Sequence, residues 1–371
     1  MEDPRIRKFA HFLINRAVYL QRGEKILIEL HGRETGLTNA LIEEAYAAGG
    51  KPFVHIFDYM VERALLTGAD CAHMADVASY ELARMKDMDA YIDIRATENI
   101  NAWKGIPESG MEAYRKEYWG PIHLDRRCNH TKWSVLRFPN DAMAQLAGMS
   151  TKDYEDFYFR ACLLDYDKMA RAMESITRRM DAADQVHITG PGTDLVFSIK
   201  GIGSCGMSGN RNIPDGEIYT APVRDSVNGT ISYNVPSPYE GFLFSDVKLT
   251  FRDGKIIEAT ANDSERLNRI LDTDEGARYV GEFAIGVNPV IQNPISDILF
   301  DEKIAGSFHF TPGKCYDNTD NGNQSAVHWD LICIQRPEFG GGEISFDGEL
   351  IRKDGLFVPE DLHCLNPENL L

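Results

Sequence analysis

Five carboxylate and imidazole side chains in the second half of the chain have the chemistry to bind metal ions together. They are Glu217, Glu282, His309, His328 and Asp330. Imidazole nitrogen and carboxylate oxygen suit zinc and other divalent ions. One catalytic ion with an open coordination position does not use five ligands, whereas two ions about 3.5–4 Å apart with a bridging carboxylate would use them all. The set therefore predicts a two-ion centre that activates a shared water and polarises a carbonyl.

The spacing in "NQSAVHWDLI", residues 323–332, brings two of these groups together. As a strand, the segment turns its apolar side chains, Val327, Trp329 and Leu331, to one face. His328 and Asp330 then share the other face, at the i, i+2 spacing that two ligands of one centre require. The alternative is a His–Asp hydrogen bond without a metal, and the segment alone favours neither interpretation.

The other three residues also have ordinary explanations when each is taken alone. Glu217 follows a Pro-Asp-Gly turn, where a glutamate is commonly solvated. Glu282 begins an apolar strand, and burying its carboxylate is costly unless it is paired or bound to metal. His309 lies between Phe308 and Phe310, a position typical of a core histidine. Only the five residues together favour a metal centre.

The first half of the chain predicts an α/β domain that contains a mostly parallel sheet. Apolar runs alternate with helix-length segments, as in βαβ units. Strands are expected at residues 25–30, 51–57, 89–96 and 132–138.

The second half predicts a mixed α+β domain that carries the candidate ligands. Residues 150–182 have a helical pattern with Ser150 or Thr151 as the N-cap, and short strands with Gly, Asn and Pro turns follow from about residue 184. We therefore expect an N-terminal domain at 1–183 and a C-terminal domain at 184–371. The GxGxxG match "GIGSCG" at 201–206 precedes turn-forming residues and cannot open the helix that a dinucleotide site needs.

Composition limits the classes of binding partner and the cellular compartment that we expect for the protein. A net charge of −18 and a pI near 5.0 argue against nucleic acid or an anionic membrane as a partner. No apolar run approaches the roughly 18 residues of a membrane span, and the N-terminal segment predicts an amphipathic helix instead of a signal peptide. Seven cysteines without CxxC pairs are typical of reduced thiols, so we expect a cytoplasmic protein.

Four segments give the chain a family resemblance. "NIPDGE" at 212–217, the Gly-Glu pair at 281–282, "LFDE…H…G..Y" across 299–316 and "S..H.D" across 325–330 occur in this order. In this the sequence resembles the metallo-aminopeptidases typified by aminopeptidase T, aminopeptidase S and PepS. The resemblance covers the whole chain and is strongest from about residue 183 onward.

The resemblance implies both an activity and a set of roles. It implies a two-domain α/β homodimer that removes N-terminal amino acids from short peptides. The implied cofactors are two divalent metal ions, zinc or cobalt before magnesium or manganese. Tyr316 is implied as a catalytic side chain. For the hydrolysis we further expect Glu282, itself a ligand, to be the carboxylate that moves the proton. The implied metal ligands are Glu217, Glu282, His309, His328 and Asp330.

The chain also departs from the family pattern close to these ligands. The family often reads Glu-Asn-Ala before the first histidine, whereas this chain has Glu302, Lys303 and Ile304. Thr311 and Pro312 replace small aliphatic residues, and the stretch between the two histidines is shortened. No ligand is removed, so these departures concern substrate preference.

A different class of enzyme is the runner-up. His309, His328 and Asp330 alone form a two-His-one-carboxylate set, as in mononuclear non-haem iron enzymes. Proteins similar to this family open dihydroxypyridine rings with such a site, which makes a ring-opening dioxygenase the alternative. The presence of Glu217 and Glu282 favours two ions and hydrolysis, and the complete ligand set disfavours an inactive binding protein.

Overall fold

The computed structural model describes residues 3–371, which form two compact units. Unit 1 comprises Met1–Leu163 and Gly209–Pro214, and unit 2 comprises Leu164–Ser208 and Asp215–Leu371. The first segment of unit 1 ends before the long helix α9 (Tyr166–Ala182), whereas the change in residue pattern predicted a domain boundary after that helix. The apolar stripe of α9, which includes Met173 and Ile176, is buried, and the helix contacts strands β7 (Cys205–Met207) and β9 (Glu217–Thr220) of unit 2.

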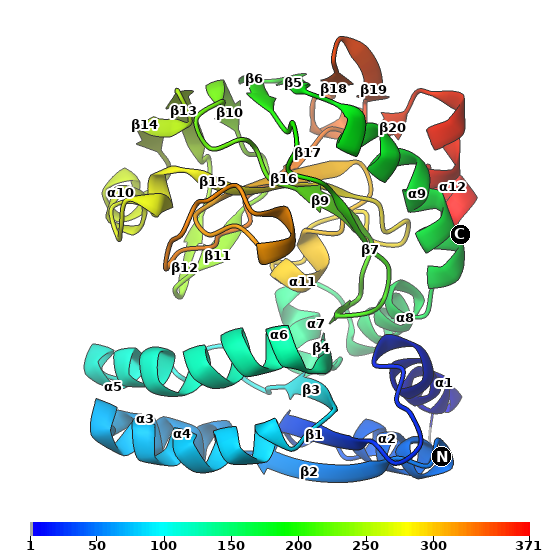
Figure 1. The fold of residues 1–371 in the computed structure, drawn as a ribbon, viewed down its shortest axis with the longest axis vertical. Helices are drawn as coiled ribbons and strands as arrows, with labels where there is room; N and C mark the ends of the chain where they lie inside the picture. Colours follow the sequence, from blue (N-terminus) through cyan, green and yellow to red (C-terminus); the bar gives the residue numbers. More distant parts are fainter. Residues whose placement is uncertain (1–2) are drawn as a thin grey trace. The chain divides into compact units, whose positions relative to one another are not determined.

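Unit 1 contains the parallel sheet that the alternating pattern predicts (Figure 1). Its strand order is β2-β1-β3-β4-β8, so the chain reverses direction across the sheet between β1 and β3. The strands are β1 (Lys25–Gly32), β2 (Lys51–Phe57), β3 (Ala90–Ala96), β4 (Lys132–Arg137) and β8 (Asn212–Ile213). The short β8 comes from the second half of the sequence and pairs with β4 through Val135 and Asn212.

Side-chain caps begin many helices of unit 1. Asp3, Asp58, Asp70 and Asn140 each accept a hydrogen bond from a backbone N–H of the first helical turn, and Ser150 is the predicted cap of α8. The helical segments are α1 (Pro4–Phe12), η1 (Leu13–Ala17), α2 (Gly36–Ala47), α3 (Tyr59–Thr67), α4 (Cys71–Lys86), α5 (Glu108–Ala113), η2 (Tyr114–Arg127), α6 (Cys128–His130), α7 (Asp141–Leu146) and α8 (Thr151–Cys162).

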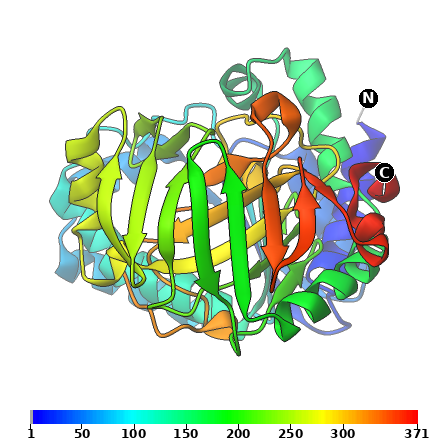
Figure 2. The ribbon, with the colours of Figure 1, turned by 90° about the horizontal axis from the view of Figure 1, so that it is seen from above.

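Unit 2 is built on two sheets whose aromatic side chains meet. The larger sheet has eight strands in the order β14-β13-β10-β6-β5-β18-β19-β20, and Figure 2 shows it face on. The smaller sheet, β17-β16-β15-β9-β7, lies behind it in that view. Phe197 of the larger sheet contacts Phe283 and Phe310 of the smaller one, with ring centroids 5.2 and 5.0 Å apart. This apolar contact leaves the other face of the smaller sheet for polar groups.

The pairs of neighbouring strands in both sheets of unit 2 are antiparallel, and the mixed α+β prediction for this part of the chain is confirmed. The strands of the larger sheet are β5 (Gln185–Gly190), β6 (Thr193–Ser198), β10 (Asn228–Ser232), β13 (Lys248–Arg252), β14 (Lys255–Thr260), β18 (Glu343–Phe346), β19 (Glu349–Lys353) and β20 (Leu356–Phe357). The remaining strands are β11 (Ser237–Tyr239), β12 (Phe242–Phe244), β15 (Val280–Gly286), β16 (Ser307–Pro312) and β17 (Ile332–Ile334). The helical segments are α10 (Ser264–Leu271), η3 (Gly276–Arg278), α11 (Ile298–Asp301), η4 (Asp317–Thr319), η5 (Pro337–Phe339), η6 (Glu360–Leu365) and α12 (Pro367–Leu370).

Three further features bear on the sequence-based expectations. None of the helices in residues 3–371 combines the length and the hydropathy that crossing a membrane requires. The seven cysteines are all free thiols. The segment 201–206 forms a turn that leads into β7 and opens no helix.

Candidate metal centre

Three of the predicted ligands come from neighbouring antiparallel strands of the smaller sheet. Glu217 begins β9 and pairs with Gly286 of β15, while His309 of β16 pairs with Ala284 of the same strand. Glu282 precedes these two positions of β15 by two and four residues, so the period of two puts all three ligands on one face. Gly286 and Ala284, which lie between them, carry no bulky side chain. The register of the sheet thus gathers residues that are almost a hundred positions apart in the sequence.

The other two ligands lie on an irregular segment, which corrects the prediction of a strand over residues 323–332. His328 forms an isolated antiparallel bridge with Gly313, and β17 begins only at Ile332. The backbone N–H of Lys314 donates to the carbonyl of Val327, so the pairing between strands is partial. The predicted alternation still holds, because Val327, Trp329 and Leu331 are buried while His328 and Asp330 are half-buried.

The five ligands form two overlapping groups that share one carboxylate. Site A consists of Glu217, Glu282 and His309, and site B consists of Glu282, His328 and Asp330. Within each site, one ligand atom of every residue lies within 4.8 Å of the others. Glu282 faces both imidazoles, because its Oε1 is 3.5 Å from Nε2 of His309 and its Oε2 is 3.2 Å from Nε2 of His328. A carboxylate with this position can bridge two ions.

Hydrogen bonds outside the ligand set orient site B. The carbonyl of Lys314 lies 2.8 Å from Nδ1 of His328, so the Nε2 atom of that ring faces the site. The hydroxyl of Thr311 donates to Oδ1 of Asp330 over 2.8 Å. Such partners are usual around metal ligands, because they fix the orientation of an imidazole or carboxylate.

Unpartnered atoms in site A test whether the residues fit a metal. Oε2 of Glu217 is buried, has no hydrogen-bond partner and lies 3.6 Å from Nε2 of His309. A buried carboxylate oxygen without a partner is costly, and a cation removes that cost. Three carboxylates and two imidazoles are also the donors that divalent zinc and cobalt accept. The residues of sites A and B therefore fit divalent metal ions.

The electrostatics of the group are dominated by burial and by mutual attraction. Burial opposes the charge of Glu282, but hydrogen bonds with His309 and His328 keep the pKa of its carboxyl below its usual value. Burial also opposes the charge of His309, yet the nearby Glu282 and Glu217 raise the pKa of that imidazole to about 9. Burial raises the pKa of Glu302, next to the centre, to about 8. In the metal-free protein the imidazoles therefore hold protons that a metal ion must displace.

Tyr316 lies beside site B, as the family resemblance implies. Its hydroxyl is 3.3 Å from Nε2 of His328, and its ring contacts those of His328 and Tyr219 at centroid distances of 5.0 and 5.3 Å. The residue is 43% exposed, which leaves the phenol accessible from solvent. All six residues singled out from the sequence are thus brought to one region of unit 2.

Sequence reasoning assigned no role to the charged residues that border site A. The ammonium of Lys303 contacts Glu217, lies 2.9 Å from Oε1 of Glu302 and lies 3.8 Å from Oδ1 of Asp215. All four side chains are buried. The usable signal was the presence of three charged residues, Asp301, Glu302 and Lys303, between the apolar residues of 298–308, because charges in a buried run must find partners.

Unit 1 holds another group with metal-ligand chemistry, which has its own counter-cation. Glu29 of β1, His55 of β2 and Glu81 of α4 place ligand atoms within 4.8 Å of one another. The guanidinium of Arg84 contacts His55 and Glu81 and lies 4.0 Å from Oε1 of Glu29. The hydroxyl of Tyr91 donates to Oε2 of Glu29 over 2.5 Å. Protein groups therefore already neutralise and hydrogen-bond this cluster.

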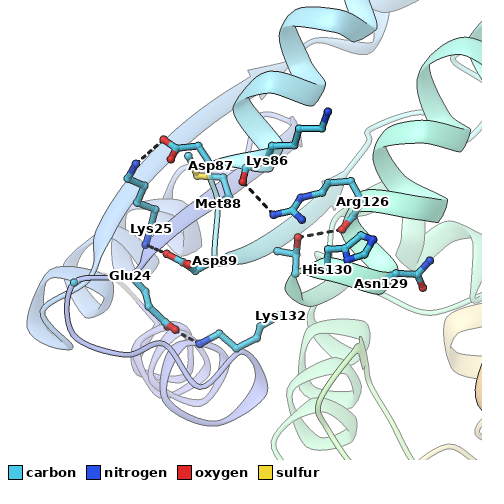
Figure 3. A pocket seen from close by; sticks show the side chains of 12 residues that line it. Glu24, Lys25, Lys86, Asp87, Met88, Asp89, Arg126, Asn129, His130 and Lys132 are labelled. Atoms are coloured by element: carbon cyan, nitrogen blue, oxygen red, sulfur yellow. Dashed lines mark hydrogen bonds and ion pairs between the residues drawn. The ribbon is translucent and has the colours of Figure 1, made fainter.

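A cavity of about 680 Å³ in unit 1 lies away from these groups (Figure 3). It is lined by residues where strands begin, including Lys25 of β1 and Lys132 of β4. Lys25 pairs with Asp87, and Lys132 pairs with Glu24 (Figure 3). Ligands of open α/β sheets bind at the carboxyl ends of the strands, which is the opposite edge. The cavity is therefore at the edge of the sheet where ligands do not usually bind, and sites A and B are the candidate site.

Sequence comparisons relate the chain to known proteins. A family model described as thermophilic metalloprotease (M29) matches residues 2–357. Aminopeptidase PepS of Streptococcus thermophilus is 25% identical over 95% of this chain and 96% of that protein. Aminopeptidase T of Thermus aquaticus is 27% identical, again over 95% of this chain and 96% of the relative.

Two solved structures share the fold over nearly the whole chain. Wild-type AmpT from Thermus thermophilus has a TM-score of 0.79 and 23% identity, covering 96% of this chain and 99% of that one. The 2,5-dihydroxypyridine dioxygenase of Pseudomonas putida KT2440 has a TM-score of 0.61 and 13% identity, covering 96% and 98%. Both likenesses concern the fold, and the architecture expected from the sequence is confirmed.

Proposed function

The chain belongs to the M29 family of thermophilic metalloproteases, and from this premise we propose a metal-dependent aminopeptidase that releases N-terminal amino acids from short peptides. Two divalent ions would be held in sites A and B. The observation that carries this proposal is Glu282, which lies between two complete ligand groups and faces an imidazole in each. A single-ion enzyme has no use for a carboxylate shared in this way.

The donor set narrows the choice of ions. Carboxylate and imidazole ligands together suit zinc or cobalt, with manganese and magnesium as weaker candidates because magnesium prefers oxygen ligands alone. All five ligands belong to unit 2, which we therefore assign as the catalytic part of the chain.

The protein groups supply proton transfer and charge stabilisation around the ions. When bound, the two ions would lower the pKa of a shared water and polarise the carbonyl of the scissile peptide bond. Glu282 is the carboxylate placed to accept a proton and pass it to the leaving amine. The phenol of Tyr316 donates a hydrogen bond to the carbonyl oxygen as that atom gains negative charge. The free α-amine of the substrate is the group by which an N-terminal residue is recognised.

A pair of peptide substrates tests the exopeptidase activity. The zinc- or cobalt-loaded protein is expected to cleave a short peptide with a free N-terminus and to leave its N-acetylated counterpart intact. Release of the first amino acid is measured by chromatography. Equal cleavage of the two peptides would exclude an aminopeptidase.

One observation keeps the runner-up function open to test. Lys303 contacts Glu217, so one carboxylate of site A already has a cationic partner. His309, His328 and Asp330 would then remain as the ligands of one non-haem iron. A protein of that kind retains one iron per chain and consumes oxygen with a dihydroxylated pyridine. Two zinc or cobalt ions and no oxygen uptake are expected instead.

The edge of the parallel sheet supports a homodimer. Strand β2 is an edge strand, and its side chains Phe53, Val54 and Ile56 are exposed, as are Met60 and Val61 of α3. An exposed apolar edge strand is a template for pairing with another chain. A second copy would bury this patch on both partners. Sedimentation is expected to show a dimer, and an Ile56→Lys variant is expected to shift it toward monomer.

The compartment is proposed from the cysteines. All seven are free thiols, two of them exposed, which suits a reducing environment. We therefore place the protein in the cytoplasm, and fractionation of cells that express a tagged chain tests this placement.

A further inference from the structure

A buried lysine distinguishes the two metal sites. Lys303 is 1% exposed, and its ammonium contacts Glu217, a ligand of site A alone. Among the ion pairs of residues 3–371, His328 and Asp330 of site B pair only with each other and with Glu282. A permanent positive charge thus stands at one site and not at the other.

The position of this ammonium is set by the backbone and by two further carboxylates. The segment after α11 passes close over β15, where a Cβ on Gly286 would lie 2.5 Å from the carbonyl oxygen of Ile304. The carbonyl of Lys303 accepts a hydrogen bond from the backbone N–H of Asn288 over 2.9 Å. Glu302 and Asp215, at 2.9 and 3.8 Å, hold the ammonium from other directions. Lys303 is therefore a built-in part of site A.

The ammonium divides the two oxygens of Glu217 between different partners. Oε1 is bound to Lys303, whereas Oε2 is buried, has no hydrogen-bond partner and lies 3.6 Å from His309. Site A can therefore still offer a carboxylate oxygen to a metal. An ion bound there would lie near a fixed positive charge in a buried environment, where like charges repel more strongly than in water. The carboxylate also gives up less of its negative charge to the metal when an ammonium shares it.

We infer that the two sites fill unequally: site B binds the first ion tightly, and Lys303 makes site A a weaker, exchangeable second site. This inference rests on the two-ion centre of the proposed function. Occupancy of site A then follows the free metal concentration around the protein. The second ion acts as a regulator of a centre whose first ion is permanent.

Zinc titration of the metal-free protein tests the inference. Isothermal titration calorimetry of the wild-type chain is expected to resolve two binding events whose Kd values differ by roughly tenfold or more, as a nearby buried charge implies. After dialysis, elemental analysis is expected to find one zinc per chain. Two events of equal affinity, or two zinc ions retained, would overturn the inference.

Two variants assign the events to the sites. Lys303→Met keeps the length of the side chain and removes the charge, so the weaker Kd is expected to tighten by roughly tenfold or more while the tighter one stays unchanged. The control is Lys353→Met, which removes an exposed ammonium that pairs with Glu343 at 2.8 Å. If Lys303→Met does not fold, Glu217→Gln decides, because it must abolish the weak event alone. Loss of the tight event in Glu217→Gln would contradict the inference.

The titration separates this inference from the proposed function. Unequal binding with no peptidase activity at saturating zinc would remove the aminopeptidase proposal and leave the role of Lys303 standing. Peptidase activity with two equal sites would do the reverse.

Discussion

Each unit of the molecule contains a cluster of buried and half-buried carboxylate and imidazole groups, and the two clusters differ in what neutralises them. In unit 1, Arg84 contacts His55 and Glu81, while Tyr91 hydrogen-bonds Glu29. In unit 2, Oε2 of Glu217 is left without a hydrogen-bond partner and without an arginine or lysine of its own. Residue types and ligand distances are alike in both. The comparison teaches that a cluster of ligand-type residues is a candidate metal centre when no arginine or lysine neutralises all of its carboxylates.

Because of Lys303, site A is intermediate between the unit 1 cluster, which a protein cation neutralises, and site B, which pairs with no lysine or arginine in the described residues. Arg84 contacts or approaches every member of the unit 1 cluster, whereas Lys303 contacts only one oxygen of one ligand of site A. Site B has no lysine or arginine among the ion pairs of the described residues that include its ligands. We accordingly expect metal affinity to rise from the unit 1 cluster through site A to site B. Four substitutions can break or sharpen this comparison.

The largest effect is expected from the carboxylate that sites A and B share. Glu282→Gln should lower turnover roughly 10³-fold or more, because it removes both a bridging ligand and the proton acceptor. Metal content should fall at both sites. The matched change in unit 1, Glu29→Gln, should leave metal content and turnover as they are. Near-normal turnover in Glu282→Gln would remove this residue from the mechanism, and metal loss in Glu29→Gln would erase the contrast between the units.

Removal of the counter-cation of unit 1 is expected to cost about 4 kcal/mol of stability, because a buried carboxylate loses its ionic partner. Arg84→Ala is the test, with urea unfolding followed by tryptophan fluorescence. Three of the four tryptophans, Trp103, Trp119 and Trp133, lie in unit 1 and report on it. Zinc should restore part of the lost stability in Arg84→Ala but not change the wild-type unit.

The control for Arg84→Ala is Lys86→Ala, which removes an exposed charge from the same helix and should be nearly neutral. A variant that is destabilised and shows no response to zinc would mean that the unit 1 cluster lacks metal-binding geometry, whatever its counter-cation.

Two buried imidazoles, His123 in unit 1 and His309 in unit 2, have pKa values shifted in opposite directions, and acid stability should show the shift of His123. Burial lowers the pKa of His123 in unit 1 to about 4, whereas carboxylates raise the pKa of His309 in unit 2 to about 9. Because the unfolded chain takes up a proton near pH 6.5 and folded His123 does not, unit 1 should lose about 3 kcal/mol as the pH falls from 6.5 to 4.

His123→Phe isolates this effect, since it keeps a ring against Trp119 and cannot be protonated. Urea unfolding of unit 1 at a series of pH values should give a flatter acid limb for this variant. The exposed His130→Asn change serves as the control and should keep the wild-type slope. An identical slope in His123→Phe would show that other groups cause the acid sensitivity.

The smallest effect compares two phenols. Tyr316→Phe should lower kcat about 10²-fold with little change in KM or metal content, because it removes one hydrogen bond to developing charge. Tyr91→Phe removes the hydrogen bond to Glu29 and should leave kcat unchanged. Steady-state kinetics and elemental analysis of both variants check this. A lower metal content in Tyr316→Phe would indicate a structural role near His328 instead.

Much of the fold was predictable because its signals are local. Apolar runs marked β1 to β4, and the capping group at Ser150 marked the start of α8. The two-residue strand β8 was not predictable, since Asn212 and Ile213 pair with β4 across a long stretch of chain. The segment with His328 was predicted as a strand because its apolar and polar residues alternate, but its pairing with Gly313 is limited to one bridge.

The candidate site shows the same division. Glu217, Glu282 and His309 could be selected as ligands because carboxylates and imidazoles stand out in apolar strands. The gathering of these three residues on one face of the sheet could not be predicted, because it depends on the register between β9, β15 and β16. In the sequence, Lys303 stood out only because it departs from the Glu-Asn-Ala pattern of the family.

By itself, the sequence determined which chemistry is available: the ligand types, their order along the chain and the strands that carry most of them. These depend on side-chain composition and local periodicity. Only the tertiary structure decided which carboxylates are neutralised by a protein cation and which are not, because Arg84 and Lys303 pair with residues far away in the chain. Coulomb attraction acts over a few ångströms in space, and distance along the sequence does not measure it.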